Sequence, residues 1–131
     1  MIEAHDYDVN LKGTGSRTGV LEAEGLPPLD VASPPEFGGP DGVWSPEHLY
    51  VASLSSCLMT TFRVIAEIAR VEVLEYSDQA TGHLRRGDDR LYRMEKITLR
   101  PRVVIADPDQ VEKAHRLLEK ADQVCLINRS V

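Results

Sequence analysis

The sequence predicts an α+β domain in which helices are segregated from antiparallel sheet. One observation behind this is a long apolar helix over residues 45–70, with strand-like segments on both sides. The other is the order of the expected elements, βββ–α–ββ–α, without internal repeats. A chain of 131 residues is long enough to bury a hydrophobic core and short enough to favour a single domain over residues 1–131.

The first part of the chain predicts a short antiparallel meander. Ile2–Leu11 alternates loosely between apolar and polar residues, which is typical of a half-exposed strand. A glycine-rich turn that contains Arg17 follows, then further strands are expected at Val20–Ala23 and Leu29–Ala32. Residues 34–44 hold three prolines and three glycines and therefore predict a loop that leads into the long helix.

The long helix has clear start signals. Pro46 suits the first helical position, Ser45 can cap the helix, and Glu47 lies in the first turn, where a carboxylate complements the helix dipole. Apolar or small residues then occur on almost all sides, which predicts a largely buried helix. About 24 residues would span roughly 36 Å, so either a kink at residues 53–56 or a partner subunit is needed to cover it. The Ser, Thr and His residues and the late charges argue against a transmembrane span.

After the helix the sequence predicts two long strands and a second helix. Val71–Leu84 and Leu91–Ile105 read as strands joined by a turn at residues 86–89, with Pro101 favouring an edge position or a bulge. Asp107 then caps an amphipathic helix that begins at Pro108 and ends near residue 122, with one apolar stripe at Val111, Ala114, Leu117, Leu118 and Ala121. Cys125 follows just beyond this helix.

Composition narrows the range of partners. The net charge is −6 and the pI is about 5.2, and Arg85–Arg86 is the main basic cluster, so nucleic acid and anionic membranes are not expected to bind. The acidic first ten residues contain no signal-peptide core, which predicts a cytoplasmic protein. The two cysteines form neither a CxxC pair nor a Cys/His ligand set, so no metal site or cofactor is expected.

Cys57 and Arg17 each allow two interpretations from the residues alone. Cys57 could be a small core residue, because free cysteine is among the most buried residue types, and Arg17 could be a solvated loop arginine. Glu47 stands ten residues before Cys57, close to three helical turns away. The two could meet only through a bend at residues 53–56, through a separate short helical piece, or across two subunits.

Several spaced motifs carry a resemblance to a known family. The chain contains PPEFGGPDGVWSPEHLYVASLSSCLMTTFRVIAE and, 68 positions after Cys57, the segment CLINRSV. This pattern resembles the OsmC/Ohr family of thiol-dependent peroxidases, which shows a GR-like glycine turn, a P-x-E-F/L-G-G segment, a helix start with P-E and a cysteine ten residues after that glutamate. The match extends from about Gly15 to Val131.

The resemblance implies an intertwined homodimer in which antiparallel sheets from both subunits wrap long central helices, with two equivalent sites at the subunit boundary. It implies that Cys57 is the peroxidatic cysteine and Cys125 the resolving one, with Arg17 favouring the Cys57 thiolate and Glu47 holding the guanidinium. The implied activity reduces organic hydroperoxides through a Cys57 sulfenic acid and a Cys57–Cys125 disulfide, which an external dithiol such as a lipoylated protein reduces. The alternative is a non-catalytic dimeric protein that binds a small ligand or lipid.

Overall fold

The computed structural model describes residues 2–131. Helices and antiparallel strand pairs make up the fold, which confirms the α+β class. The chain forms two compact units, Met1–Leu49 and Tyr50–Val131, and the boundary between them falls inside the first long helix. The expectation that residues 1–131 act as one domain stays a prediction.

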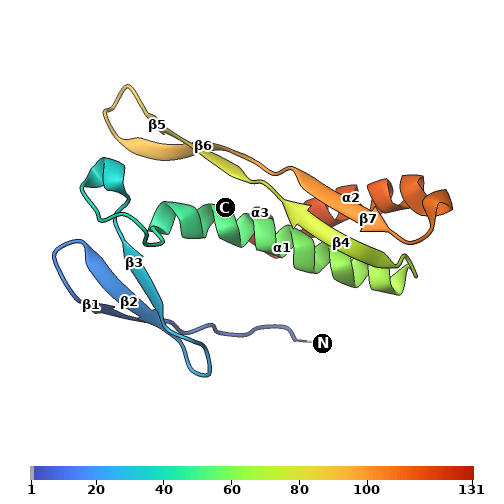
Figure 1. Cartoon of the computed structure of the whole chain (residues 1–131), viewed down its shortest axis with the longest axis horizontal. Coiled ribbons are helices and arrows are strands. Elements are labelled where there is room, and N and C mark those ends of the chain that lie inside the picture. Colours follow the sequence, from blue (N-terminus) through green and yellow to red (C-terminus); the bar gives the residue numbers. More distant parts are fainter. Residues whose placement is uncertain (1) are drawn as a thin grey trace. The chain divides into compact units, whose positions relative to one another are not determined.

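The first unit contains the expected antiparallel meander. Its strands are β1 (Asn10–Gly13), β2 (Thr18–Glu22) and β3 (Leu29–Ala32), paired in the order β1-β2-β3 (Figure 1). The prediction of a strand over Ile2–Leu11 is wrong for most of its length. Asn10 pairs with Glu22, and a turn closed by Leu26 N–H and the Ala23 carbonyl follows directly, so earlier residues have no strand beside them.

The loop after β3 ends beside the same strand from which it starts. It includes a short 3₁₀ turn, η1 (Pro35–Phe37), and returns to β3 through a parallel bridge between Val31 and Trp44. The Ala32 N–H donates to the Trp44 carbonyl at 2.9 Å. This return delivers the chain to the start of the long helix at a defined place beside the meander.

Helix α1 (Pro46–Ile68) begins where the sequence predicts. The Ser45 hydroxyl accepts a hydrogen bond from the His48 N–H at 3.1 Å, and Ser45 is fully buried. The helix runs without interruption through residues 53–56, and its buried side chains recur every four residues at Leu54, Leu58, Phe62 and Ala66. Among the described residues, α1 alone is long and apolar enough to cross a membrane, a test that the core helix of a soluble protein also passes.

Four strands follow α1, where the sequence predicts two. They are β4 (Val73–Asp78), β5 (Thr81–Arg86), β6 (Tyr92–Thr98) and β7 (Pro101–Ile105). They form two antiparallel pairs, β4–β7 and β5–β6, that follow one another along a single ribbon in Figure 1. The two long predicted strands are thus each divided, and the two divisions lie at the same level of the ribbon.

Asp78 explains where the ribbon divides. Its carboxylate accepts the Arg100 N–H at 2.6 Å and the Ser55 hydroxyl at 2.5 Å, so one side chain joins the two strand junctions to α1. A backbone N–H that bonds to a carboxylate is not available to a strand ladder. Pro101 is the first residue of β7, and because the β4–β7 sheet has only two strands it lies at an edge, as predicted.

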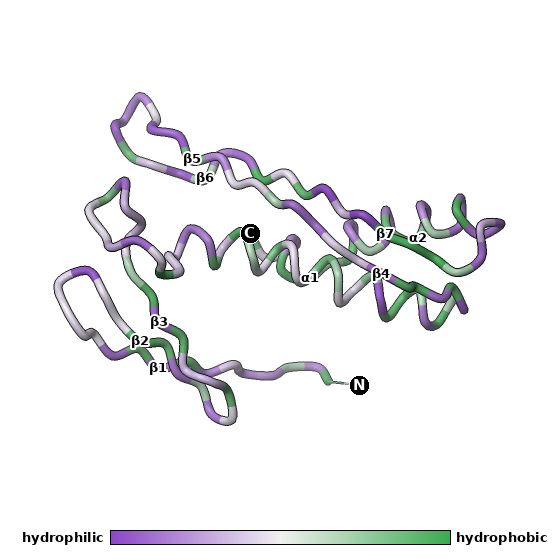
Figure 2. Tube along the Cα trace, viewed as in Figure 1, coloured by the Kyte–Doolittle hydropathy of each residue, from purple (hydrophilic) through white to green (hydrophobic). Residues whose placement is uncertain are grey.

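The second unit is closed by the C-terminal helices. Asp107 caps a 3₁₀ turn, η2 (Pro108–Gln110), by accepting the Asp109 N–H at 2.9 Å, and α2 (Val111–Val124) and α3 (Leu126–Ser130) follow. The regular second helix therefore starts three residues later than predicted and ends two residues later. The core consists of side chains from α1, α2 and the segment after α1, namely Leu58, Phe62, Ala66, Val71 and Ala121. Figure 2 shows hydrophobic residues on β7, on the later turns of α1 and on the strands of the meander, and hydrophilic residues at the β5–β6 turn.

Candidate functional site

Two thiols meet inside the second unit. Cys57 lies in the middle of α1 and is half-buried, and Cys125 lies in the break between α2 and α3 and is 2% exposed. Both cysteines are free, and the Cys125 thiol donates a hydrogen bond to the Cys57 sulfur. Two residues that are 68 positions apart in the sequence thus lie close enough for each thiol to shift the pKa of the other.

The break between α2 and α3 fixes the position of Cys125. Ala121, one turn earlier on α2, is fully buried in the core and anchors the end of that helix. The backbone of Cys125 then leaves the helical region, with ψ of 117°, while its carbonyl accepts the Arg129 N–H at 3.0 Å. The Asn128 side-chain amide donates to the Asp122 carbonyl at 3.2 Å, which ties the short α3 back to α2.

Hydrogen bonds to the Cys57 sulfur favour its thiolate. Burial is the largest single influence and by itself raises the pKa of Cys57, but the hydrogen bonds together outweigh it and lower the pKa. The donors are the Cys125 thiol, the Ile127 N–H, the Thr61 hydroxyl and the Leu126 N–H. A thiol with a lowered pKa supplies more of the reactive anion at neutral pH.

Cys125 has the opposite tendency. Burial is the largest influence and raises the pKa of Cys125, and the hydrogen bond that it donates to Cys57 and the negative charge on the Cys57 thiolate raise it further. These effects together outweigh the Asn128 and Ile127 N–H groups, which lower it. The pair therefore ionises first at Cys57 and keeps the remaining proton on Cys125. One sulfur is prepared as a nucleophile and its neighbour as a protonated thiol.

Arg17 belongs to the first unit, where a glycine loop supports it. The Arg17 carbonyl accepts the Ser33 N–H at 3.1 Å, and the side chain, although exposed, passes over Gly38. A Cβ at Gly38 would stand 3.2 Å from the Arg17 Nε, and one at Gly39 would collide with the Ser33 carbonyl. Gly38 therefore leaves room for the Arg17 side chain, and Gly39 leaves room for the Ser33 carbonyl.

Glu47 also belongs to the first unit, in the first turn of α1. Its Oε1 is buried and has no hydrogen-bond partner among the described residues. Because α1 is uninterrupted, Glu47 does not stand on a separate helical piece, and ten residues at 1.5 Å each separate it from Cys57 by about 15 Å along the axis. Of the four predicted site residues, the structure brings Cys57 and Cys125 together, while Arg17 and Glu47 lie in the other unit.

The sequence interpretation missed the groups that hydrogen-bond the Cys57 sulfur. Thr61 lies one helical turn after Cys57, and its Oγ1 is 3.8 Å from the Cys57 Sγ. The i,i+4 spacing of a hydroxyl after a cysteine on a helix was a usable signal. The N–H groups of Leu126 and Ile127 had no comparable signal, because they become available only through the break at Cys125.

A cavity of about 460 Å³ opens beside Cys125. Apolar side chains from α1, the end of β6 and α2 form most of its wall, and two carboxylates and one amide stand among them. Its lining residues are Leu54, Leu58, Ile97, Thr98, Leu99, Pro101, Leu118, Glu119, Asp122, Cys125 and Asn128. Cys57 is not among the described residues that line it.

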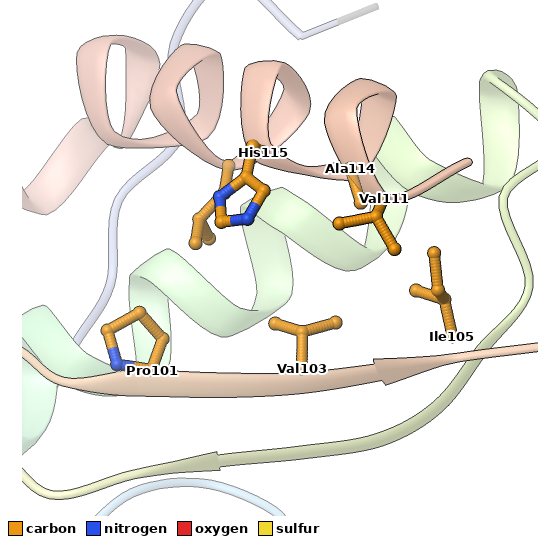
Figure 3. A pocket seen from close by; sticks show the side chains of 7 residues that line it. Pro101, Val103, Ile105, Val111, Ala114 and His115 are labelled. Atoms are coloured by element: carbon orange, nitrogen blue, oxygen red, sulfur yellow. The ribbon is translucent and has the colours of Figure 1, made fainter. Parts of the chain in front are cut away.

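A smaller cavity of about 120 Å³ lies between β7 and α2. Figure 3 shows Val103 and Ile105 of β7 facing Val111, Ala114 and His115 of α2 across it. It holds no thiol among the described residues. Nor do residues 2–131 contain a group of three His, Cys, Asp or Glu side chains that could hold a metal ion.

Comparison with known proteins matches most of the chain to one protein family. Residues 39–131 match the family described as OsmC-like protein. The chain is 26% identical to the uncharacterized protein YmaD of Bacillus subtilis, over the whole chain and 89% of that protein. An OsmC-like protein of unknown function from Vibrio cholerae superposes with a TM-score of 0.84 at 26% identity, covering 99% of this chain and 94% of that one.

A further solved structure has a functional description. It is an organic hydroperoxide resistance protein OsmC from Legionella pneumophila, with a TM-score of 0.72, 26% identity and coverage of 97% of this chain and 90% of that one. The family match covers well over half of the chain, so the protein belongs to the OsmC-like family.

Proposed function

We propose that this protein is a thiol-dependent peroxidase that reduces organic hydroperoxides to alcohols. The observation that carries the proposal is the Cys57–Cys125 contact, in which hydrogen bonds lower the pKa of Cys57 while the pKa of Cys125 is raised. The description of the Legionella pneumophila relative as an organic hydroperoxide resistance protein supports the same chemistry.

The first step is oxidation of Cys57. Its thiolate attacks the distal oxygen of ROOH, the O–O bond breaks, and the departing alkoxide takes up a proton to become the alcohol. The sulfur is left as a sulfenic acid, two electrons more oxidised. Leu54 and Leu58, one turn before Cys57 and directly after it on α1, are buried apolar side chains that would favour an organic hydroperoxide over hydrogen peroxide.

The second step is resolution by Cys125. The Cys125 thiol loses its proton and attacks the Cys57 sulfenic sulfur, a disulfide forms and water leaves. The hydrogen bond between the two thiols supports this step, because little movement is needed to join the sulfurs. An external dithiol then restores both thiols and carries away the two electrons as its own disulfide.

Arg17 and Glu47 complete the site in this proposal. A guanidinium beside the Cys57 thiolate favours its ionised form, and a carboxylate can hold the guanidinium by a bidentate pair. The unpartnered Glu47 Oε1 supports a role as the acceptor of such a pair. Since Glu47 and Cys57 stand about 15 Å apart along one helix, Arg17 and Glu47 of one subunit would serve the cysteines of the other.

A homodimer is therefore part of the proposal. Val64 and Ile68 of α1 are 56% and 78% exposed in the single chain, which leaves an apolar face for a second copy to cover. In an intertwined dimer, residues 1–131 of each copy would act as one OsmC-like domain. We place the protein in the cytoplasm, where lipoylated proteins and other dithiols are reduced.

The direct test is consumption of cumene hydroperoxide with dihydrolipoamide as reductant. Wild type should turn over, Cys57→Ser should lose activity, and Cys125→Ser should be oxidised at Cys57 without forming an intrachain disulfide. Mass spectrometry under non-reducing conditions checks the disulfide. Equal slow consumption by wild type and Cys57→Ser would contradict the peroxidase and favour the alternative of a non-catalytic binding protein, for which the cavity beside Cys125 offers a ligand site.

A further inference from the structure

We propose that the reductant enters the cavity beside Cys125, attacks the Cys125 sulfur of the oxidised protein, and is selected there by Glu119 and Asp122 as a neutral or cationic dithiol. This inference rests on the proposed function, because it assigns the partner that closes the same reaction cycle. It adds an entry site, a point of attack and a charge preference.

Only one of the two cysteines is among the described residues that line the cavity. Cys125 is part of its wall, together with apolar side chains such as Leu54, Leu58 and Leu99, whereas Cys57 is not among the described lining residues. Its volume of about 460 Å³ lies in the range of pockets that hold small organic ligands. An aliphatic dithiol can therefore bury its carbon chain against the leucines and present a sulfur to Cys125.

The reaction balances as two thiol–disulfide exchanges. A thiolate of the dithiol attacks the Cys125 sulfur, the Cys57–Cys125 bond breaks, and Cys57 leaves as a thiolate. The second thiol of the dithiol then loses its proton and attacks the sulfur of its own first arm, which releases Cys125 as a thiolate that takes up that proton. The dithiol leaves as a cyclic disulfide, and two electrons have passed to the protein.

The pKa values of the two possible leaving thiols also favour attack of the reductant at Cys125. In thiol–disulfide exchange, the sulfur whose thiol has the lower pKa leaves faster. The hydrogen bonds donated by Thr61, Leu126 and Ile127 lower the pKa of Cys57. The same donors would stabilise the Cys57 thiolate when it leaves. Attack at Cys57 would instead expel Cys125, whose pKa is raised by burial.

Two carboxylates make the cavity selective. Glu119 and Asp122 lie one turn apart on the same face of α2, both in the lining, and no Lys or Arg is among the described lining residues. A reductant that carries its own carboxylate is repelled by Glu119 and by Asp122. Each of these two side chains, a few ångströms away in solvent-exposed surroundings, should slow the reaction of such a reductant by about 5-fold. Dihydrolipoamide should therefore react faster than dihydrolipoate.

The first experiment locates the attack. Diamide forms the Cys57–Cys125 disulfide without any peroxidase activity, after which the protein is treated with 2-mercaptoethanol, alkylated with iodoacetamide and analysed by peptide mass spectrometry. The expected product carries mercaptoethanol on Cys125 and the alkyl group on Cys57. The reverse distribution, or failure of diamide to join the two sulfurs, would overturn the inference. A protein that gives the expected product but consumes no hydroperoxide would refute the proposed peroxidase alone.

The second experiment measures the charge preference. The ratio of disulfide-reduction rates with dihydrolipoamide and dihydrolipoate is compared in wild type, Glu119→Gln and Asp122→Asn. Each substitution should lower the ratio by about 5-fold, and salt should lower it in wild type. Glu112→Gln is the matched control, because it removes the same charge from an exposed position of α2 outside the cavity. A ratio near one in wild type, or an equal ratio in all variants, would overturn the selection.

Discussion

The Cys125 thiol donates its hydrogen bond to the Cys57 sulfur, so the two cysteines are already partners before any oxidant arrives. The direction of this bond assigns unequal chemistry to two residues of one type. Cys57 is the acceptor and carries the negative charge, and Cys125 keeps its proton until Cys57 has been oxidised. The order of events in the proposed cycle follows from this asymmetry.

Removing the Cys125 donor should raise the pKa of Cys57. Cys125→Ala deletes the hydrogen bond, whereas Cys125→Ser replaces the thiol by a hydroxyl that can still donate, so the pKa of Cys57 should rise in the alanine variant and less in the serine variant. The rate of iodoacetamide alkylation against pH measures this. A shared profile for both variants would contradict the hydrogen bond as a cause.

Thr61→Val tests a second donor to the same sulfur. The substitution keeps the shape of the side chain and removes the hydroxyl that lies 3.8 Å from the Cys57 Sγ. The alkylation profile should shift to higher pH, by less than in Cys125→Ala because Thr61 contributes less to lowering the pKa of Cys57. Thr60→Val is the control, since the Thr60 hydroxyl donates to the Cys57 carbonyl and not to the sulfur.

Gly38→Ala should impair peroxidase activity through Arg17. The added methyl would stand 3.2 Å from the Arg17 Nε, so the guanidinium must shift by a few tenths of an ångström. Gly42→Ala is the matched control, because Gly42 has a similar positive φ, 77° against 86°, with nothing within 4 Å of the new methyl. We expect kcat/KM for hydroperoxide to fall by at least about 10-fold only in Gly38→Ala. Equal activities in the two variants would remove Gly38 from this role.

Charges on the exposed face of α1 should separate the subunits. Val64→Asp with Ile68→Asp places two carboxylates where the proposed dimer buries apolar side chains, at a cost that a dimer interface cannot absorb. Light scattering should give a monomer for this variant and a dimer for wild type. Leu91→Asp, at an equally exposed position outside α1, should remain dimeric. A monomeric wild type would refute the proposed assembly.

Tyr76 should make stability fall at high pH. Burial, helped by the charge of Asp78, raises the pKa of Tyr76 to about 12 from 10, so the folded chain keeps a proton that the unfolded chain releases. The contribution to stability is complete below pH 10 and is lost as pH rises to 12. Tyr76→Phe removes this part of the decline and also removes a buried hydroxyl that has no hydrogen-bond partner within residues 2–131, which should stabilise the fold by about 1 kcal/mol at neutral pH. Urea unfolding of both proteins at several pH values measures the two effects.

Local signals placed the start of α1 and the strand β3 and came within three residues of the bounds of α2. They missed the short helix α3 and the division of the strands after α1. Ser45 and Pro46 mark the start of α1, and the Pro/Gly-rich loop before them is equally visible in the sequence. The division of the ribbon depends on Asp78 accepting the N–H of Arg100, 22 residues away, and no local pattern announces such a bond. The failed strand near the N-terminus has a similar cause, because β2 ends at Glu22 and offers no further partner.

The sequence likewise predicted some residues of the candidate site and not others. The motifs that carry the family resemblance were enough to select Cys57 and Cys125, which the structure brings near each other. The catalytic roles of Cys57, Cys125, Arg17 and Glu47 all stay predictions. The N–H donors at Leu126 and Ile127 and the carboxylates on the cavity wall depend on how α2 ends against the core, which the sequence pattern does not specify.

The break at Cys125 also gives the protein a built-in reporter of its own oxidation. In the reduced chain the amides of Leu126 and Ile127 point at an anionic acceptor. A disulfide carries no such charge, so both amides lose their anionic acceptor at the first turn of the five-residue helix α3. Deuterium uptake at these two amides should therefore rise on oxidation and return on reduction, which allows the redox state to be followed without labelling either sulfur.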